Sequence, residues 1–379
     1  MKDKTLNNNR AWDYDSLIRG EILEISPYVP GKPVEEVQRE LGITDVIKLA
    51  SNENPLGPSP QGRAAVSQAL SQLHIYPDGN SYYLKQALAA KLGVKVEELI
   101  IGNGSDEIIK LLAEAFFRPG DEVVISEHTF GEYAYAAHLM GAKIRRVPAG
   151  QGFGHDLEQM AAAVTERTKA VFICNPNNPT GTMNTRDELE KFISSVPPQV
   201  LIVLDQAYFE YVEDPAYPDG INYIGDGRVL VLRTFSKIYG LAGLRVGYGI
   251  GGAGLISYLN RVKEPFNVNI PAQAAARAAL DDAEFLAKSK KLNQDGITFL
   301  TAGFKELGLD YVPTQTNFLL FATPYHSKNV FRPMMEKGVI VRTGDIFGLP
   351  KHIRVTVGTK EQNERFLKAL KEVLIELGK

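Results

Sequence analysis

The 379-residue sequence has little of what marks several large classes of protein. Its single cysteine, Cys174, excludes an intramolecular disulfide, and its place at the end of an apolar stretch predicts a buried structural thiol. The six histidines fall at none of the spacings that put two ligands on one helix face or turn, so no metal site is predicted. No apolar run is long enough to span a bilayer, which argues against a membrane protein.

The sequence also lacks an excess of charge of one sign. Lysines and arginines are scattered along a chain of net charge −3, which argues against a nucleic-acid partner and favours a small-molecule one. The first residues, Met1–Asn7, are polar and lack the apolar core of a signal peptide, so we expect a cytoplasmic location.

Short apolar runs rich in β-branched residues alternate with helical segments from about residue 99 to 250. This alternation is typical of parallel strands joined by crossover helices and predicts an α/β core. A helix is expected after Ser105, which can cap it, and should stop at Arg118–Gly120. We expect strands at Leu99–Gly102, Glu122–Ser126, Lys143–Val147, Lys169–Cys174, Val200–Leu204, Val229–Arg233 and Arg245–Ile250.

After about residue 270 the pattern changes to long helices with a few short strands. The helices are expected at Ala272–Leu280 and Ala283–Leu307, and the strands near Asn317–Phe321, Val339–Arg342 and Ile353–Val357. Because the chain is longer than one ordinary core, we expect either two structural domains or one large domain with an appendage. The predicted parts are an N-terminal arm that also packs on the small domain (residues 1–50), a large α/β domain (51–275) and a small α+β domain (276–379).

The segment Val229–Gly249 joins an expected strand to a glycine-rich stretch, and Lys237 follows the strand directly. A lone lysine is usually solvated. Here, however, Thr234 and Ser236 add hydroxyl donors, and Arg245 offers a planar guanidinium that suits a phosphate. These companions favour a functional lysine beside an anion site.

Three more segments place polar groups at strand ends. Gly102–Asp106 leads into a helix whose first amides can bind phosphate, although an ordinary tight turn explains it equally well. Asn175–Gly181 is a run of turn-formers at the carboxyl edge of the sheet, where α/β proteins bind ligands, with a plain loop as the alternative. Asp205 follows a buried strand either as a helix cap or as a functional acid.

Other enzyme motifs are absent or incomplete. Gly247–Gly252 matches the dinucleotide pattern G-x-G-x-x-G, but no acid follows about twenty residues later to bind a ribose. Neither a G-x-S-x-G elbow nor a phosphate-binding glycine-lysine loop occurs, which argues against a serine hydrolase and a P-loop enzyme.

Taken together, these segments resemble the fold type I aminotransferases and, within them, the histidinol-phosphate aminotransferases. The resemblance follows the family's order over nearly the whole chain, through Ser26–Pro33, Leu49–Pro55, Tyr76–Gly79 and Arg354–Thr359. It implies a large domain with a mostly parallel seven-stranded sheet, a smaller α+β domain, and pyridoxal 5′-phosphate (PLP) as cofactor.

The resemblance also implies a role for each site residue. Lys237 would hold PLP as a Schiff base and then move a proton as the base. Asp205 would keep the pyridine nitrogen protonated, while Asn178 and Tyr208 would donate to the phenolic oxygen. Phe130, a tyrosine in many relatives, would stack on the ring. The phosphate would be held by Gly104, Ser105, Asp106, Thr234, Ser236 and Arg245, with Tyr76 from a second subunit.

For the substrate, the resemblance implies that Arg354 clamps the α-carboxylate and that Asn52 and Tyr28 line the same pocket. Arg342 is at the position associated with the phosphate of histidinol phosphate, with a solvated strand-end arginine as the alternative. Gln206 departs from the glutamate that commonly follows the aspartate, and we expect modest electrostatic consequences.

The implied protein is a homodimer that transfers an amino group between L-histidinol phosphate and 2-oxoglutarate, forming glutamate, in histidine biosynthesis. The alternatives are an aromatic amino-acid aminotransferase, a PLP-dependent lyase or decarboxylase on the same fold, and a binding module without activity.

Overall fold

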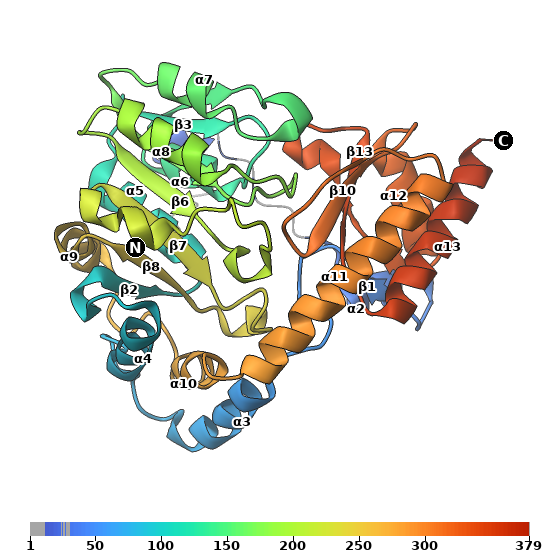
Figure 1. The fold of residues 1–379 in the computed structure, drawn as a ribbon, viewed down its shortest axis with the longest axis horizontal. Helices are drawn as coiled ribbons and strands as arrows, with labels where there is room; N and C mark the ends of the chain where they lie inside the picture. Colours follow the sequence, from blue (N-terminus) through green and yellow to red (C-terminus); the bar gives the residue numbers. More distant parts are fainter. Residues whose placement is uncertain (1–11, 24, 26, 28–30, 379) are drawn as a thin grey trace, which may run out of the picture.

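The computed structural model describes residues 12–378 except 24, 26 and 28–30, and Tyr28 lies outside the described residues (Figure 1). The described strands form three sheets. The largest has seven strands in the order β2-β8-β7-β6-β5-β3-β4. Their bounds are β2 (Leu99–Gly102), β3 (Glu122–Ser126), β4 (Lys143–Val147), β5 (Thr168–Cys174), β6 (Leu201–Asp205), β7 (Val229–Thr234) and β8 (Gly247–Gly251).

The seven-stranded sheet is mostly parallel, and β8 is the strand that runs antiparallel to both of its neighbours. The predicted α/β fold class is therefore confirmed. The inner strands read as mostly apolar runs because helices cover both faces of the sheet, so side chains that alternate up and down are buried on either side. The edge strand β4 is more polar and largely exposed.

The two faces of the large sheet have separate apolar cores. In β5, Val171 and Ile173 belong to one core, whereas Ala170 and Phe172 belong to the other. The first core includes residues of α4 (Tyr82–Leu92), α7 (Leu157–Ala162), α8 (Arg186–Ser195) and α10 (Ile270–Ala279), and α3 (Pro60–Ala69) packs on α10. The second includes residues of α5 (Ser105–Phe116), α6 (Glu132–Leu139) and α9 (Ala253–Val262) (Figure 1).

A smaller antiparallel sheet lies beside the large one and has the order β12-β13-β10-β9 (Figure 1). It comprises β9 (Tyr311–Val312), β10 (Phe318–Ala322), β12 (Arg342–Thr343) and β13 (His352–Thr356). The helices of this part are α11 (Ala283–Glu306), α12 (Ser327–Glu336) and α13 (Lys360–Leu377). Its core contains Phe304, Phe321 and Phe366, whose rings contact one another.

The N-terminal part joins this smaller unit. After α1 (Gly20–Leu23) and α2 (Val34–Leu41), strand β1 (Ile47–Lys48) pairs in parallel with β11 (Val339–Ile340). Val37 of α2 packs with Ala50 and Ile340 in an apolar cluster.

Several predicted boundaries need correction. The single strand expected at Val339–Arg342 is two strands, β11 and β12, which belong to different sheets. Ser105 is the first residue of α5 rather than its cap, because Gly104 takes the N-cap position with φ of 79°. Strand β8 begins at Gly247 rather than at Arg245, because Arg245 ends a short 3₁₀ turn in the left-handed conformation, with φ of 56°.

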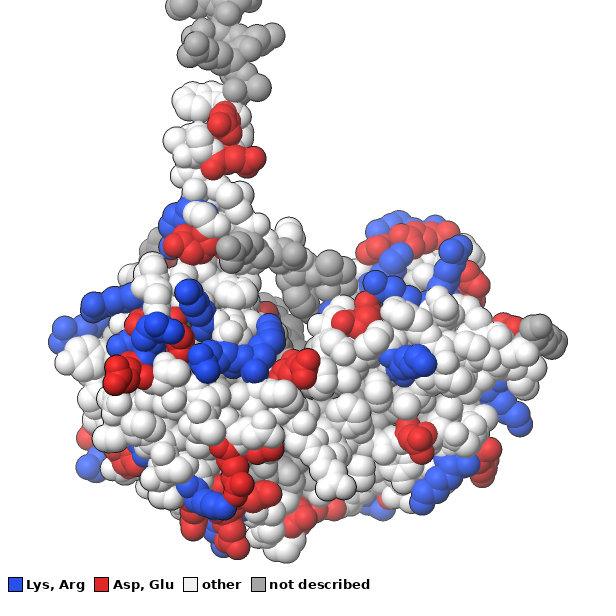
Figure 2. Space-filling view, turned by 90° about the horizontal axis from the view of Figure 1, so that it is seen from above, with Lys and Arg blue, Asp and Glu red and all other residues white. Residues whose placement is uncertain are grey.

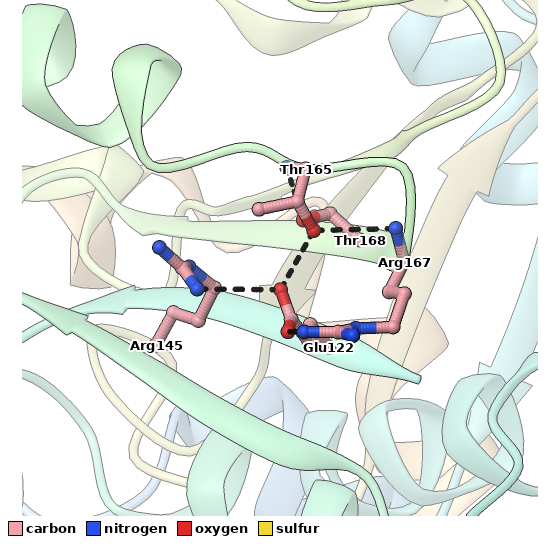
Figure 3. Close-up of polar contacts among 5 residues, drawn as sticks. All are labelled: Glu122, Arg145, Thr165, Arg167 and Thr168. Atoms are coloured by element: carbon pink, nitrogen blue, oxygen red, sulfur yellow. Dashed lines mark hydrogen bonds and ion pairs between the residues drawn. The ribbon is translucent and has the colours of Figure 1, made fainter. Parts of the chain in front are cut away.

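A buried carboxylate ties three strands together, away from the carboxyl edge of the sheet (Figure 3). Glu122 opens β3 and accepts hydrogen bonds from Arg167 Nε (3.0 Å) and Nη2 (2.6 Å) and from Thr165 Oγ1 (2.7 Å). Arg145 of β4 adds a longer ion pair at 3.6 Å. Because Thr165 and Arg167 lie just before β5, the network connects the starts of β3 and β5 to Arg145 in the middle of β4.

Of the helices that the structure describes, none combines the length and apolarity that a bilayer span requires. Figure 2 shows acidic and basic side chains intermixed over the face in view.

Candidate active site

A cavity of about 220 Å³ opens at the carboxyl ends of β5, β6 and β7. This is the edge at which open α/β sheets bind ligands. Residues far apart in the sequence line it: Ser51, Glu53, Ser105, Asp106, Phe130, Cys174, Asn178, Asp205, Ala207, Tyr208, Thr234, Ser236, Lys237, Ala242 and Arg245.

Lys237 reaches the cavity from a tight loop after β7. The loop is held by hydrogen bonds from Gly240 N to Lys237 O (3.0 Å) and from Leu241 N to Phe235 O (3.1 Å), and the side chain of Phe235 is fully buried. Burial lowers the pKa of the Lys237 amine to about 8, and the Arg354 cation acts in the same direction. At pH 7 roughly one amine in ten is then neutral, far more than for an ordinary lysine, and the neutral amine is the nucleophile for a carbonyl group.

Asp205 is the last residue of β6 and lines the cavity. Tyr133 of α6 donates a hydrogen bond to Asp205 Oδ2 (2.7 Å), and the Ala207 amide donates to Oδ1 (3.1 Å). Burial raises the pKa of the Asp205 carboxyl to about 6, although the hydrogen bond from Tyr133 opposes this shift. The carboxylate is therefore mostly ionised at pH 7 and can stabilise a cation in the cavity.

Two polar side chains join the wall of the cavity to the smaller sheet. Asn52 Nδ2 donates to the hydroxyl oxygen of Tyr208 (2.8 Å), so the Tyr208 proton remains available for another acceptor. Arg354 of β13 donates through Nη1 to Asn178 Oδ1 and through Nη2 to Ala50 O (2.7 Å). Because the Asn178 side-chain oxygen accepts a hydrogen bond from Arg354, its amide hydrogens remain available to donate to a ligand in the cavity.

One end of the cavity is built to bind an anion. Helix α5 begins there, and Gly104 gives no side-chain cap to its first amides. A Cβ on Gly104 would lie 2.4 Å from Arg245 Nη2, so only glycine allows the guanidinium to come this close. Likewise a Cβ on Gly247 would lie 2.6 Å from the Ser105 amide, which explains why β8 needs glycine at this point.

Arg245 and two hydroxyl groups complete this end. Arg245 Nη1 donates to Ser236 Oγ (3.4 Å), and Nη2 pairs with Asp106 Oδ2 (3.2 Å). Thr234 Oγ1 donates to Ser236 Oγ (3.0 Å). A guanidinium, hydroxyl donors and helix amides that converge on one point suit a phosphate.

Most of the predicted site residues line the cavity or contact a residue that does, as Gly104, Asn52 and Arg354 do. There are three exceptions. Tyr76 is 81% exposed, stacks on Phe266 and does not line the cavity of its own chain. Arg342 does not line it either, but lies opposite Arg354 in the pairing of β12 with β13. Tyr28 falls outside the described residues.

Sequence reasoning missed Tyr133, which donates a hydrogen bond to Asp205. An aromatic residue in a helix carries no sequence signal that its side chain contacts the end of a strand. Sequence reasoning also missed Glu53 and Ser51 as lining residues, although both lie within the segment Leu49–Pro55. Cys174 is buried as predicted, but it lines the cavity as well, and burial raises the pKa of its thiol far above the ordinary value.

Gln206 does not line the cavity. Its Nε2 donates to Pro218 O (2.8 Å), and its Oε1 accepts from Arg233 Nη2 (3.1 Å) and from the Gly220 amide (3.2 Å). The side chain thus supports the buried Arg233. Among the residues that the structure describes, no cluster of metal-ligating side chains occurs.

A parallel sheet with a desolvated lysine, a facing acid and a phosphate cradle at its carboxyl edge defines a class of cofactor-dependent enzyme. The family model for aminotransferase class I and II matches residues 44–370, and the chain belongs to this family. A histidinol-phosphate aminotransferase from Moorella thermoacetica is 58% identical over 94% of this chain and 92% of the relative. Another, from Caldicellulosiruptor saccharolyticus, is 49% identical over 94% of this chain and all of the relative.

A solved structure agrees with these sequence relatives. The histidinol-phosphate aminotransferase from Sinorhizobium meliloti, crystallised in complex with pyridoxal-5′-phosphate, aligns with a TM-score of 0.89 and 28% identity. The alignment covers 97% of this chain and 99% of that one.

Proposed function

We propose that this protein is a PLP-dependent aminotransferase that acts on L-histidinol phosphate and 2-oxoglutarate in histidine biosynthesis. The observation that carries the proposal is the meeting of Lys237, Asp205 and the anion cradle around one cavity. The family match and the names of relatives at 49–58% identity over nearly the whole chain support the same activity.

The residues present fit PLP. Ser236, Arg245 and the amino end of α5 would hold its phosphate, while Asp205 would face its ring nitrogen. Phe130 would cover the ring, and Asn178 with Tyr208 would donate to its phenolic oxygen. When bound, PLP supplies an electron sink for the bond broken at the substrate's α-carbon.

The chain's own residues would carry the proton and hold the charges. Lys237, with its pKa lowered to about 8, would be suited to take the proton from the substrate's α-carbon. An anion at 3–4 Å from a cation contributes on the order of 4 kcal/mol at an effective dielectric near 20, so Asp205 would keep the ring nitrogen protonated. The buried Arg354 would hold the anionic group beside the substrate amine.

Histidinol phosphate and glutamate differ at that anionic group, because one carries a phosphate ester and the other an α-carboxylate. Arg354 and Arg342 face each other across β12 and β13, which would give the site two guanidinium groups on one strand pair. A doubly charged phosphate uses such a pair better than a carboxylate does. This arrangement favours histidinol phosphate over the second candidate substrate, an aromatic amino acid.

The test is a substrate panel of histidinol phosphate, phenylalanine, tyrosine and aspartate with 2-oxoglutarate as acceptor. We expect histidinol phosphate to have the highest kcat/KM, and Arg342→Ala to raise its KM about tenfold or more while changing that for phenylalanine much less. A higher kcat/KM for phenylalanine would contradict the proposed substrate. Equal effects of Arg342→Ala on both substrates would contradict the role of Arg342.

We also propose a homodimer in which Tyr76 reaches the cofactor phosphate of the other subunit. Its high exposure and the neighbouring exposed Leu73, Ile75 and Tyr83 suit an interface. Mixing inactive Lys237→Ala with Tyr76→Ala should restore activity, because one site of the mixed dimer regains both residues. If mixed dimers form and stay inactive, the shared site is wrong.

The predicted domains and location also remain proposals. The separate apolar cores support a division into a large-sheet part and a smaller part around Phe304. Ala276, Ala279 and Leu280 belong to a core of the large sheet, so the large part extends past the proposed boundary at residue 275 to the end of α10. Cell fractionation tests the cytoplasmic location.

A further inference from the structure

A histidine outside the cavity connects the loop after β3 to the smaller sheet. His128 Nδ1 lies 2.8 Å from Phe347 O, at the end of the 3₁₀ turn Gly344–Phe347 between β12 and β13. A carbonyl oxygen can only accept, so Nδ1 carries the hydrogen in this contact. His128 does not line the cavity, and none of the roles above uses it.

His128 stands on a rigid support. Its carbonyl oxygen accepts from Asn177 Nδ2 (2.8 Å), and the side chain of the next residue, Thr129, donates to Asn177 Oδ1 (2.9 Å). Asn177 precedes Asn178 in the turn that lines the cavity, and Phe130 follows two residues after His128. The His128 backbone is therefore tied to the turn that lines the cavity.

The turn that contains Phe347 allows the His128 imidazole to come close. Gly348 follows Phe347 with φ of 76°, and a Cβ there would lie 3.3 Å from His128 Cε1 and 3.4 Å from Nδ1. The Leu349 amide donates to Gly344 O (2.9 Å) and closes the turn. A fixed carbonyl and a closed turn leave the Phe347 backbone little freedom, which in turn fixes where its ring can lie.

The Phe347 ring contacts Arg354, the arginine proposed to bind the substrate anion. The Arg354 guanidinium carbon lies 5.4 Å from the Phe347 ring centroid and 5.2 Å from that of Phe318, both within cation–π range. Phe318 is fully buried in the sheet, so its ring cannot move, whereas Phe347 is only partly buried and depends on its backbone contacts.

A second contact lies beside the first. The Phe153 ring, from the large-sheet part, meets His352 at 5.3 Å edge-on and packs on Leu349 and Leu320 of the smaller part. The His128 contact is thus one edge of an interface between the two sheets.

We propose that His128 is a positioning residue for substrate binding: its hydrogen bond to Phe347 O holds the Phe347 ring against Arg354 and so fixes the guanidinium that grips the substrate anion. This inference rests on the proposed role of Arg354. It requires only that the substrate carry an anionic group there, so it applies to whichever amino donor the panel identifies.

The test compares His128→Ala with His128→Asn in the holoenzyme, because the asparagine amide can still donate to Phe347 O. We expect His128→Ala to raise the KM for 2-oxoglutarate and for the amino donor about tenfold, with kcat and PLP affinity within about twofold of wild type. His128→Asn should recover most of the KM. The matched control is His326→Ala, which also removes an imidazole contact to the backbone, at the start of α12, and should leave KM unchanged.

A double-mutant cycle separates positioning from general support. If His128 acts through the ring, His128→Ala should change KM less than about twofold in a Phe347→Leu background. An unchanged KM in His128→Ala, a defect in His128→Asn as large as in His128→Ala, or additive effects with Phe347→Leu would each overturn the proposal. Should the alanine variant fail to fold, a raised KM in His128→Asn overturns it and a wild-type KM supports it. A wild type inactive on histidinol phosphate but active on another donor would refute the proposed substrate alone.

Discussion

Two side chains of the cavity have pKa values shifted toward their neutral forms by burial. The Lys237 amine has its pKa lowered to about 8, and the Asp205 carboxyl has its pKa raised to about 6. Each shift records a cost of holding a charged group away from water. A bound cofactor with an aldehyde at one end and a protonated nitrogen at the other would use both groups and offset this cost.

This cost predicts opposite effects of Asp205→Asn on stability and activity. The folded pKa of about 6 lies above the ordinary 3.8, so ionisation of Asp205 destabilises the PLP-free protein. Below about pH 4 the carboxyl is protonated and this stability is fully present; it is lost as the pH rises through 6. Asparagine does not ionise. Above pH 6 the PLP-free variant should therefore be more stable than wild type, by on the order of 3 kcal/mol at most.

The same variant should lose roughly 10³-fold in kcat, because the ring nitrogen loses a facing anion worth about 4 kcal/mol. Urea unfolding of the PLP-free proteins between pH 4 and 8, with steady-state kinetics of the holoenzymes, checks both effects. A PLP-free variant less stable than wild type at pH 8, together with undiminished activity, would show that Asp205 does not face the ring nitrogen.

Among single residues, the sequence predicted the site residues that directly follow a strand. It could not predict the contacts of residues that reach the site from a distant element. Lys237 and Asp205 each follow an apolar run, so their place at the carboxyl edge could be inferred. Tyr133 reaches Asp205 from helix α6, and Arg354 reaches Asn178 across 176 positions of sequence. Such contacts depend on how elements pack, which local pattern does not encode.

At the scale of elements, strand positions were predictable because buried parallel strands read as continuous apolar runs. Strands β2, β3 and β4 have the expected bounds, and most others differ by one or two residues. The division between β11 and β12 was not predictable. Val339–Arg342 is one β-rich run, but the chain changes sheet at Val341.

The Glu122 network gives a prediction for the amino edge of the large sheet. Hydrogen bonds from Thr165 and Arg167 lower the pKa of the Glu122 carboxyl. A depressed folded pKa means that the stabilisation is present above the ordinary value of 4.5 and is lost as the pH falls through the folded pKa. Glu122→Gln should therefore lower the free energy of unfolding by about 2–3 kcal/mol at pH 7, and the difference should shrink under acid.

Denaturant unfolding at pH 7 and below pH 4 measures this effect. The control is Glu158→Gln, which removes an exposed ion pair with Lys191 and should leave the free energy of unfolding almost unchanged. Equal losses in the two variants, or a Glu122→Gln loss that does not depend on pH, would show that the network does not hold the strands.

At the scale of the molecule, the cavity depends on both parts of the chain. The large-sheet part supplies Lys237, Asp205 and the anion cradle to the lining. Arg354 of β13, in the smaller sheet, donates a hydrogen bond to the lining residue Asn178. The division into parts could be predicted from the change in pattern near residue 270. The pairing of β1 with β11 could not, because it joins two short segments separated by nearly the whole chain.

The central claim is that Lys237 is the residue that binds PLP covalently. The most direct measurement is borohydride reduction of the purified yellow holoenzyme, followed by mass spectrometry of its peptides. The account predicts one reduced PLP group per chain, located on the peptide that contains Lys237, and a Lys237→Ala protein that takes up no PLP covalently and has no activity. A reduced group on another lysine, or an active Lys237→Ala protein, would contradict it.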